Sequence, residues 1–232
     1  MNTIAERLES AYQQIAQQCT KFGSNPVDVQ LIAVSKTKPD SDILSAYQAG
    51  QRHFGENYPQ ELAEKAVALT QLKEICWHFI GPLQSNKTRL VAEHASWCHS
   101  LDRLKIASRL SAQRPEQLPP LKVLLQVNIS GETSKAGINP DQVIALATEV
   151  AALPGLELKG LMAIPAPEEQ APVEPAFARM QQLSQMLRTH FPQASELSMG
   201  MSDDWPLALK YGATMIRLGT AIFGVRNYER HE

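Results

Sequence analysis

Leu31-Ile32-Ala33-Val34-Ser35-Lys36 is a short apolar run that ends in a lysine, and Thr37-Lys38-Pro39 follows it directly. The aliphatic residues predict a buried strand, and the proline predicts that strand pairing stops just beyond it. The strand would therefore place the amine of Lys36 at the mouth of a sheet. Burial lowers the pKa of a lysine, and a neutral amine can condense with an aldehyde to give a Schiff base. The alternative for Lys36 alone is a side chain that reaches solvent from a strand end.

Runs of this kind recur along the chain, separated by helical patterns. The candidate strands are Val29–Lys36, His53–Glu56, Trp77–Leu83, Trp97–Leu101, Lys122–Asn128, Leu158–Ile164, Glu196–Met201 and Met215–Gly219. The expected helices are residues 2–21, which form an amphipathic pattern, and then Asp42–Ala49, Asp141–Ala152, Pro175–His190 and Trp205–Tyr211. For the second helix, Asp40 or Ser41 is a candidate N-cap, and Gly50 suits the position after its end.

Alternation of strands and helices indicates a parallel sheet. Eight strands in a chain of 232 residues favour a closed (β/α)8 TIM barrel, a single domain over residues 1–232 with an extra N-terminal helix. An open doubly wound sheet is the alternative. It is weakened because no Gly-x-Gly-x-x-Gly opens a helix.

Composition excludes several classes of protein. Hydrophobic residues make up 44% of the chain, and the formal charge of −2 without a basic stripe argues against a nucleic-acid binder. The three cysteines form neither a disulfide framework nor a metal-ligand pair, which fits a reducing compartment. His78, His94 and His99 show no metal-ligand spacing on one element, so no metal is expected. Without a signal peptide or an apolar run of membrane-spanning length, we expect a cytoplasmic protein away from the membrane.

In such barrels the active groups lie at the carboxyl ends of the strands. Here those ends are rich in polar and small residues. We expect Ser202 to cap a helix beginning at Asp203, and Gly219 to Gly224 to form a short helical turn. The loops after the last two strands are a frequent phosphate site in these barrels. If phosphate binds here, the negatively charged Asp203 and Asp204 must point away from it. Ser202 could instead be an ordinary N-cap, and Gly219 a simple hinge.

Arg217 lies within the last apolar strand. An arginine that faces inward is costly without a partner. It could pair with a carboxylate such as Glu56, or donate to an acceptor on a ligand.

With these strand ends in view, the chain resembles the pyridoxal phosphate homeostasis protein family, in its bacterial form. The matching segments occur in the family's order along the whole chain: Ala33–Pro39, Phe54–Tyr58, Trp77–Lys87, Gly160–Ile164, Leu197–Asp204 and Arg217–Gly224.

The resemblance implies a barrel like the N-terminal domain of alanine racemase, with pyridoxal 5′-phosphate held as a Schiff base on Lys36. By position in the matching motifs, the other cofactor-binding residues would be Ser202, Gly219 and Thr220 at the phosphate, Arg217 at the pyridine nitrogen, and Asn57 and Met162 beside the ring. Lys135 would be a second lysine that helps the cofactor to move.

Two functions follow from this resemblance. An amino-acid racemase needs a second acid/base, a tyrosine from an added β-domain of the partner subunit. The chain ends soon after the eighth strand, so we expect that domain to be absent, and Tyr58 or Tyr228 would have to substitute. A carrier that buffers pyridoxal phosphate and passes it to apo-enzymes fits one lysine and a phosphate cradle better. We therefore expect a monomeric homeostasis protein without catalytic turnover. A Schiff-base aldolase acting on sugar phosphates is a third alternative.

Overall fold

The computed structural model describes residues 3–131, 136–167, 169 and 171–224. Its strands are β1 (Gln30–Val34), β2 (His53–Glu56), β3 (Cys76–Phe79), β4 (Trp97–Leu101), β5 (Leu121–Gln126), β6 (Leu156–Met162), β7 (Glu196–Ser198) and β8 (Met215–Leu218). Its α-helices are α1 (Ile4–Phe22), α2 (Asp40–Gln48), α3 (Pro59–Ala68), α4 (Thr88–His94), α5 (Leu104–Gln113), α6 (Val143–Ala151), α7 (Val173–His190), α8 (Trp205–Lys210) and α9 (Thr220–Phe223). Short 3-10 turns occupy Pro26–Asp28, Ser85–Lys87 and Pro140–Gln142.

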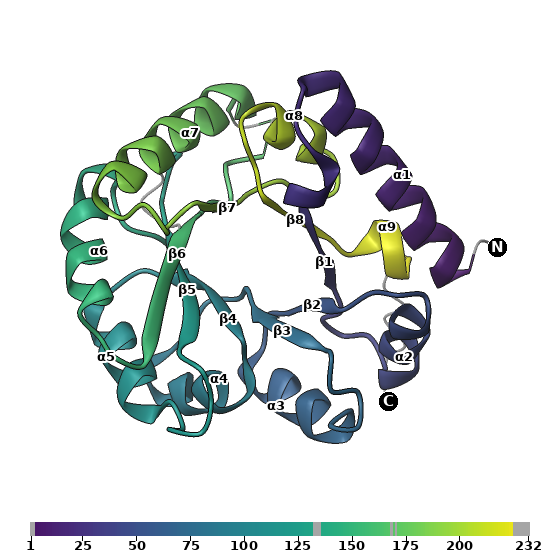
Figure 1. Cartoon of the computed structure of the whole chain (residues 1–232), viewed down its shortest axis with the longest axis horizontal. Helices are drawn as coiled ribbons and strands as arrows, with labels where there is room; N and C mark the ends of the chain where they lie inside the picture. Colours follow the sequence, from purple (N-terminus) through teal and green to yellow (C-terminus); the bar gives the residue numbers. More distant parts are fainter. Residues whose placement is uncertain (1–2, 132–135, 168, 170, 225–232) are drawn as a thin grey trace.

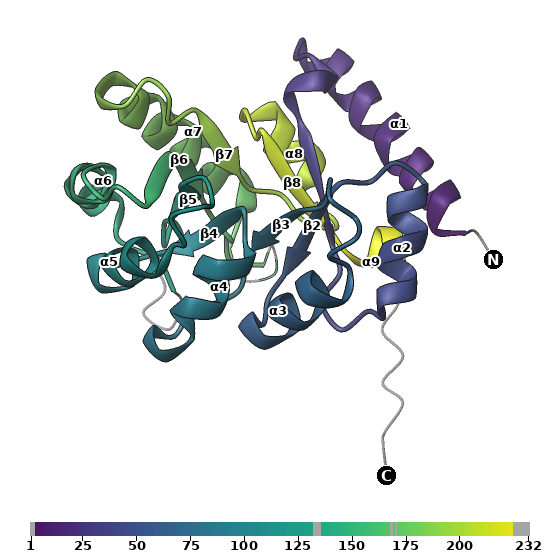
Figure 2. The same ribbon diagram turned by 60° about the horizontal axis from the view of Figure 1, so that its bottom comes forward.

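The strands form one closed parallel barrel in chain order, and the helices surround it (Figure 1). The ring closes where β8 pairs with β1, with Ile32 opposite Arg217 and Ala33 opposite Leu218. The tilted view shows the strands as a central layer with helices outside them (Figure 2). The predicted (β/α)8 barrel with an extra N-terminal helix is confirmed.

Several predicted boundaries differ from those in the structure. The predicted bounds of β2 and β4 match the structure, whereas the other six strands end earlier than predicted, for example at Val34 instead of Lys36 and at Ser198 instead of Met201. The polar residues at their ends therefore belong to loops, where their side chains are available for chemistry. The predicted cap of α2 is wrong, because the helix already begins at Asp40 and Pro39 occupies the N-cap position. Gly50 adopts a φ of 96°, as a residue just after a helix end commonly does.

Helix α1 precedes the barrel and packs beside its closing seam. Thr3 and Glu6 form a reciprocal capping box at its start, and Gly23 ends it in the left-handed conformation, with a φ of 71°. The helix lies along α8 and α9 (Figure 1). Arg7 Nη1 donates to the carbonyl oxygen of Ile222, at 3.2 Å, which ties α1 to α9.

Apolar side chains fill two separate cores. The larger core lies between the strands and the helices, and the smaller one consists of Ile32, Trp97, Leu124, Met162 and Met215. These five residues come from five strands around the ring, and only the barrel interior can bring them together. Because side chains alternate along a strand, His99, two residues after Trp97, and Arg217, two residues after Met215, also point inward.

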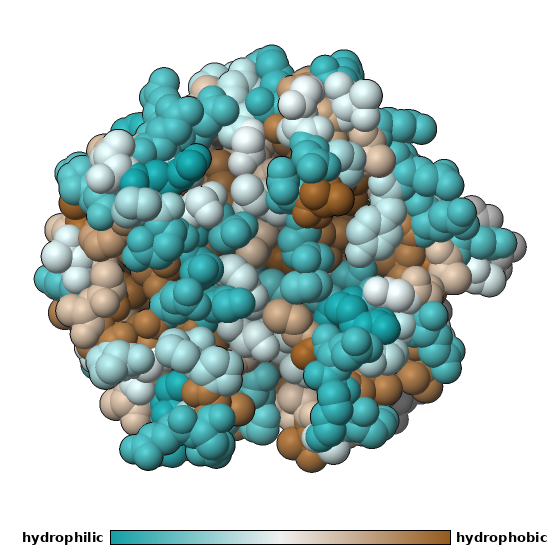
Figure 3. Space-filling view, in the orientation of Figure 1, coloured by the Kyte–Doolittle hydropathy of each residue, from teal (hydrophilic) through white to brown (hydrophobic). Residues whose placement is uncertain are grey.

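The outer surface is mostly polar. In the orientation of Figure 1, hydrophilic side chains cover most of the face and hydrophobic ones show in the gaps between them (Figure 3). Among the described residues, no helix is both long and apolar enough to cross a membrane.

Candidate functional site

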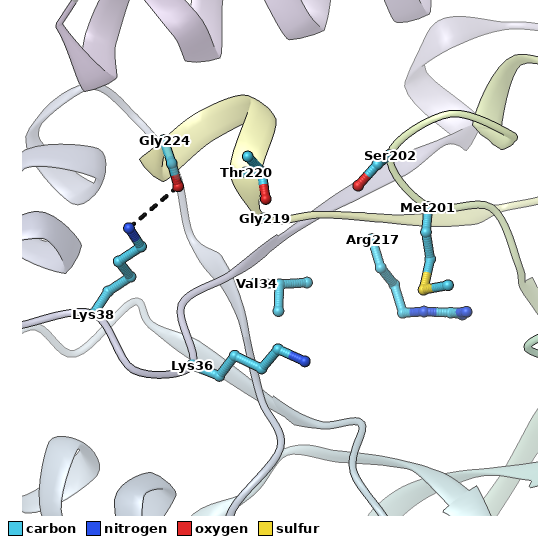
Figure 4. A pocket seen from close by; sticks show the side chains of 9 residues that line it. All are labelled: Val34, Lys36, Lys38, Met201, Ser202, Arg217, Gly219, Thr220 and Gly224. Carbon is cyan, nitrogen blue, oxygen red and sulfur yellow. Dashed lines mark hydrogen bonds between the residues drawn. The ribbon is translucent and has the colours of Figure 1, made fainter. Parts of the chain in front are cut away.

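A pocket opens at the carboxyl end of the barrel, beside the seam between β8 and β1. It is lined by Val34, Lys36, Lys38, Met201, Ser202, Arg217, Gly219, Thr220 and Gly224 (Figure 4). Five of the seven residues predicted to bind the cofactor line it together: Lys36, Ser202, Arg217, Gly219 and Thr220. They come from segments far apart in the sequence, which barrel closure brings together.

Lys36 lies two residues beyond the end of β1 and is half-buried. Its amine points toward Arg217, whose guanidinium is turned away from that amine, and Val34 lies between Lys36 and Gly219 (Figure 4). Thr37, the next residue, has a φ of 62°, a conformation that a β-branched residue adopts only when its surroundings hold it. The backbone N–H of Thr37 donates to the carboxylate of Glu61.

Ser35, the residue before Lys36, is bound by the buried side chain of Lys65. Lys65 Nζ donates to the carbonyl oxygen of Ser35 and to Glu56 Oε1, both at 2.8 Å, and to Glu61 Oε1 at 2.7 Å. The hydroxyl of Ser35 donates to the same Glu56 oxygen at 2.6 Å. Burial raises the pKa of Glu56, and the charge of Lys65 opposes that shift. This network fixes the backbone on both sides of Lys36.

The opposite wall carries hydroxyls and a glycine. The side chain of Ser202 approaches the pocket from the loop after β7, and that of Thr220 from the start of α9 (Figure 4). Gly219 has no close neighbour at the position of a Cβ atom, where the nearest atom would be the Val34 carbonyl oxygen at 3.4 Å. Packing therefore does not require glycine here. A Cβ atom at Gly219 would instead fill part of the space between Gly219 and Val34.

Two predictions about this wall have different outcomes. The prediction of a short helical turn after Gly219 is confirmed, since α9 covers Thr220–Phe223. The prediction that Ser202 caps a helix at Asp203 is wrong, because α8 begins at Trp205. The carboxylate of Asp204 instead accepts the backbone N–H of Met201 at 2.6 Å, and burial raises its pKa.

Lys38 adds a second amine near this wall. Its Nζ donates to the carbonyl oxygens of Phe223 and Gly224, each at 3.2 Å, so it binds the end of α9 to the loop after β1. Figure 4 draws the bond to Gly224.

Arg217 is buried, with 3% of its surface exposed. The predicted pairing with Glu56 is wrong, because Glu56 pairs with Lys65. The guanidinium donates to Ser198 Oγ and, at 3.0 Å, to the carbonyl oxygen of Ala163. Burial lowers the pKa of Arg217 to about 10, so it is still charged at neutral pH.

The remaining predicted residues lie away from the pocket walls. Asn57 follows β2, and its Oδ1 is buried without a hydrogen-bond partner among the described residues. Met162 is fully buried in the inner core below the pocket. Tyr58 is 55% exposed and does not line the pocket, while Lys135 and Tyr228 lie outside the described residues.

Sequence reasoning did not single out Lys65, nor a row of polar side chains inside the barrel. His53, His78, His99 and Ser198 follow one another there at hydrogen-bond distance. His53, Cys76 and His78 also bring one potential metal-ligand atom each within 4.8 Å of one another. Cys76 and His78 are two residues apart on β3, but His53, His99 and Ser198 belong to three other strands, so spacing along one element does not reveal either arrangement.

The alanine racemase N-terminal domain matches residues 6–227 of this chain. The pyridoxal phosphate homeostasis protein of Escherichia coli K12 is 52% identical over 233 residues, covering 99% of this chain and 100% of the relative. The protein of the same name from Haemophilus influenzae is 55% identical over 232 residues, covering 98% of this chain and 95% of the relative.

Solved structures show the same similarity. PipY of Synechococcus elongatus, 42% identical, superimposes with a TM-score of 0.85 without pyridoxal phosphate and 0.82 with it bound. In both cases 96% of this chain and all of PipY are covered. The barrel, its strand ends and these full-length relatives agree, and the chain therefore belongs to the family of pyridoxal phosphate homeostasis proteins, built on the alanine racemase N-terminal fold.

Proposed function

We propose that this protein binds pyridoxal 5′-phosphate in the pocket at the β1–β8 seam and serves its homeostasis by buffering and delivering it. The observation that carries the proposal is the arrangement of the pocket in Figure 4. Lys36 and Arg217 line one pocket, with the Lys36 amine pointing toward Arg217, and Ser202, Gly219 and Thr220 line the wall beside them. The name of the curated relatives and the PipY structure with the cofactor bound support the same ligand.

The residues present fit the chemical parts of the cofactor. Lys36 would bind the aldehyde as a Schiff base, and Ser202, Gly219 and Thr220 would hold the phosphate through hydroxyls and backbone N–H groups. Because Gly219 carries no side chain, an anion in the pocket can approach its backbone. Arg217 would donate to the pyridine nitrogen, while Asn57 and Met162 would support the ring region from outside the pocket walls.

When bound, pyridoxal phosphate supplies an electrophilic aldehyde and a ring that accepts electrons. A guanidinium has only donors, so Arg217 would leave the ring nitrogen unprotonated and make the ring a weak electron sink. This favours holding the cofactor over turnover. We propose a monomer in the cytoplasm that delivers the cofactor to apo-enzymes.

The racemase alternative requires a second acid/base opposite Lys36. Among the described residues that line the pocket there is no tyrosine or histidine, and Tyr58 points to solvent. The carrier function needs no such group.

Borohydride reduction tests the binding site. The wild-type protein mixed with pyridoxal phosphate should show a visible absorption band, and reduction should leave the pyridoxyl mass on Lys36. Lys36→Ala should abolish the band and keep the far-UV circular dichroism of the barrel. Lys38 is the internal control because it lines the same pocket, and a pyridoxyl mass on Lys38 instead would contradict the assignment.

Two activity assays separate carrier from racemase. The loaded protein should restore the activity of a pyridoxal-phosphate-dependent apo-enzyme, and it should convert L-alanine to D-alanine no faster than Lys36→Ala does. Racemisation that depends on Lys36 would favour the enzyme instead.

A further inference from the structure

A row of hydrogen bonds runs through the interior of the barrel from its amino end to Arg217. His53 Nδ1 lies 2.9 Å from His78 Nε2, and His78 Nδ1 lies 2.9 Å from His99 Nε2. His99 Nδ1 lies 2.9 Å from Ser198 Oγ, which also accepts from Arg217. His99 and Ser198 belong to β4 and β7, which are not neighbours in the sheet, so this bond crosses the barrel interior. We call His53, His78 and His99 the histidine row.

The two ends of the row differ in exposure. His53 is the first residue of β2 and is half-buried at the amino end of the barrel, whereas His78 and His99 are fully buried. Arg217 lines the pocket at the carboxyl end. The row therefore connects the solvent at one end with the pocket at the other.

Arg217 gives this row a single direction. A guanidinium can only donate, so Ser198 Oγ must accept from it. Ser198 Oγ has a second lone pair, but among the described residues His99 Nδ1 is the one acceptor within reach of the Ser198 hydroxyl hydrogen, so the hydroxyl donates to it. A neutral imidazole that accepts on Nδ1 carries its proton on Nε2, so His99 donates to His78 Nδ1. The same step repeats from His78 to His53.

We propose that the histidine row is a one-way hydrogen-bond relay, with every imidazole neutral and protonated on Nε2, that positions Arg217 for the pyridine ring. The second half of this statement rests on the proposed function. His99, His78 and His53 are thus positioning residues. They hold Ser198, and through it the guanidinium, in one orientation beneath the pocket.

The electrostatic surroundings keep the imidazoles neutral. Burial lowers the pKa of His99 far below its usual value, and the charge of Arg217 adds to this effect. Burial likewise lowers the pKa of His78, helped by His99, His53 and Lys122. For His53, burial lowers the pKa and Lys122 lowers it further.

At the amino end of the row, His53 and His78 could instead bind a metal ion together with the neighbouring Cys76. A metal ion would need the lone pair of His78 Nε2, and that nitrogen carries the proton in the relay. Lys122 also places a positive charge beside the three groups, as its effect on their pKa values shows. The tautomer of His78 therefore distinguishes the two uses.

The first test is nitrogen-15 NMR of the assigned histidine rings in the protein without cofactor. In the relay, all three residues of the row show a protonated Nε2 and an unprotonated Nδ1 at neutral pH. A proton on Nδ1 of His78 or His99, or a metal-bound Nε2 of His78, would overturn the proposal.

The second test breaks the relay at Ser198. Ser198→Ala removes the atom that joins Arg217 to His99 with little change in volume, and Ser100→Ala is the matched control. Ser100 is also a buried serine, but its Oγ lies 3.9 Å from Cys98 Sγ, whose side chain belongs to the larger core outside the barrel interior. Ser198→Ala should weaken pyridoxal phosphate binding about tenfold, shift the ring signals of His99 and His78, and leave binding of inorganic phosphate unchanged. Ser100→Ala should change none of these.

The outcomes separate the relay from the function. If the wild type fails to bind pyridoxal phosphate, the proposed function fails, and with it the link to the pyridine ring. If wild type and Ser198→Ala bind it equally, the positioning role alone is overturned. Should Ser198→Ala not fold, His53→Leu tests the same row from its half-exposed end, because it removes the acceptor of His78 and should shift the ring signals of His78. Unchanged His78 signals would overturn the relay.

Discussion

The Nζ atom of Lys65 lies 2.8 Å from the carbonyl oxygen of Ser35, the residue that directly precedes Lys36. Lys65 is 5% exposed and belongs to α3, outside the sheet. Through this bond a helix on the outside of the barrel controls the backbone that presents the Lys36 amine. Glu56 and Glu61 neutralise the buried ammonium.

Lys65→Met should destabilise the protein strongly. It leaves the Glu56 carboxylate buried without its cation, and removal of one partner of a buried ion pair costs about 3–5 kcal/mol. Urea denaturation measures the loss. Arg89→Gln is the control, since it breaks the exposed pair with Glu93 and should cost less than about 0.5 kcal/mol. A loss for Lys65→Met as small as that of the control would contradict this account of the network.

Thr37→Gly should leave the protein as stable as the wild type or raise its stability by up to about 1 kcal/mol. Glycine adopts the left-handed conformation of Thr37 without strain. The free energy gained by relieving this strain exceeds the free-energy cost of the extra conformational entropy that glycine gives the unfolded chain. Thermal unfolding measures the effect. Thr37→Val keeps the β-branched shape and the strain, so it should show no such gain. A clear loss of stability in Thr37→Gly would show that the threonine side chain itself is needed.

Gly219→Ala should separate binding from stability. The φ of −113° suits alanine, and the nearest atom to the new Cβ would lie at ordinary contact distance, so the unfolding free energy should change by less than about 1 kcal/mol. Binding of pyridoxal phosphate and of inorganic phosphate should fall at least about tenfold, which calorimetric titration measures.

Gly81→Ala provides the opposite case. A Cβ at Gly81 would clash with the backbone oxygen of Asn57, so the backbone must shift, at a cost of about 1–3 kcal/mol or more. If Gly219→Ala lost as much stability as Gly81→Ala, the glycine after β8 would be structural.

Stability should fall as the pH drops below about 6.5, because of the buried histidines. In the unfolded chain His78 binds a proton near pH 6.5, whereas burial lowers its pKa in the folded state. The unfolded state then binds more protons, which costs at most about 1.4 kcal/mol per pH unit for one histidine. His78→Gln should show a shallower slope in urea denaturation between about pH 7.5 and 5.5. Equal slopes would mean that His78 takes up its proton in the folded state as well.

The sequence predicted the barrel because each strand and helix carries its own local pattern. Lys36, Ser202, Gly219 and Thr220 could be placed at one mouth, since strand ends of a parallel barrel share one rim. These inferences need only the order of elements and the direction of the strands.

Partners of buried charges could not be predicted in this way. Glu56 was a reasonable partner for Arg217, but in the structure Glu56 forms its ion pair with Lys65, from the helix that follows β2. The bond between His99 and Ser198 joins residues 99 positions apart across the barrel, and no pattern within one element indicates it. The register and tilt of the strands decide which inward side chains meet.

The pairing of β8 with β1 has a consequence for the order of events during synthesis. Lys36 follows the first strand and Gly219 the last, so the pocket has no partial form in a shorter chain. A nascent chain still on the ribosome acquires the amine early and the opposite wall only when the residues around 220 emerge. Ligand binding would thus require that the barrel has closed, and a bound ligand would slow the separation of β8 from β1.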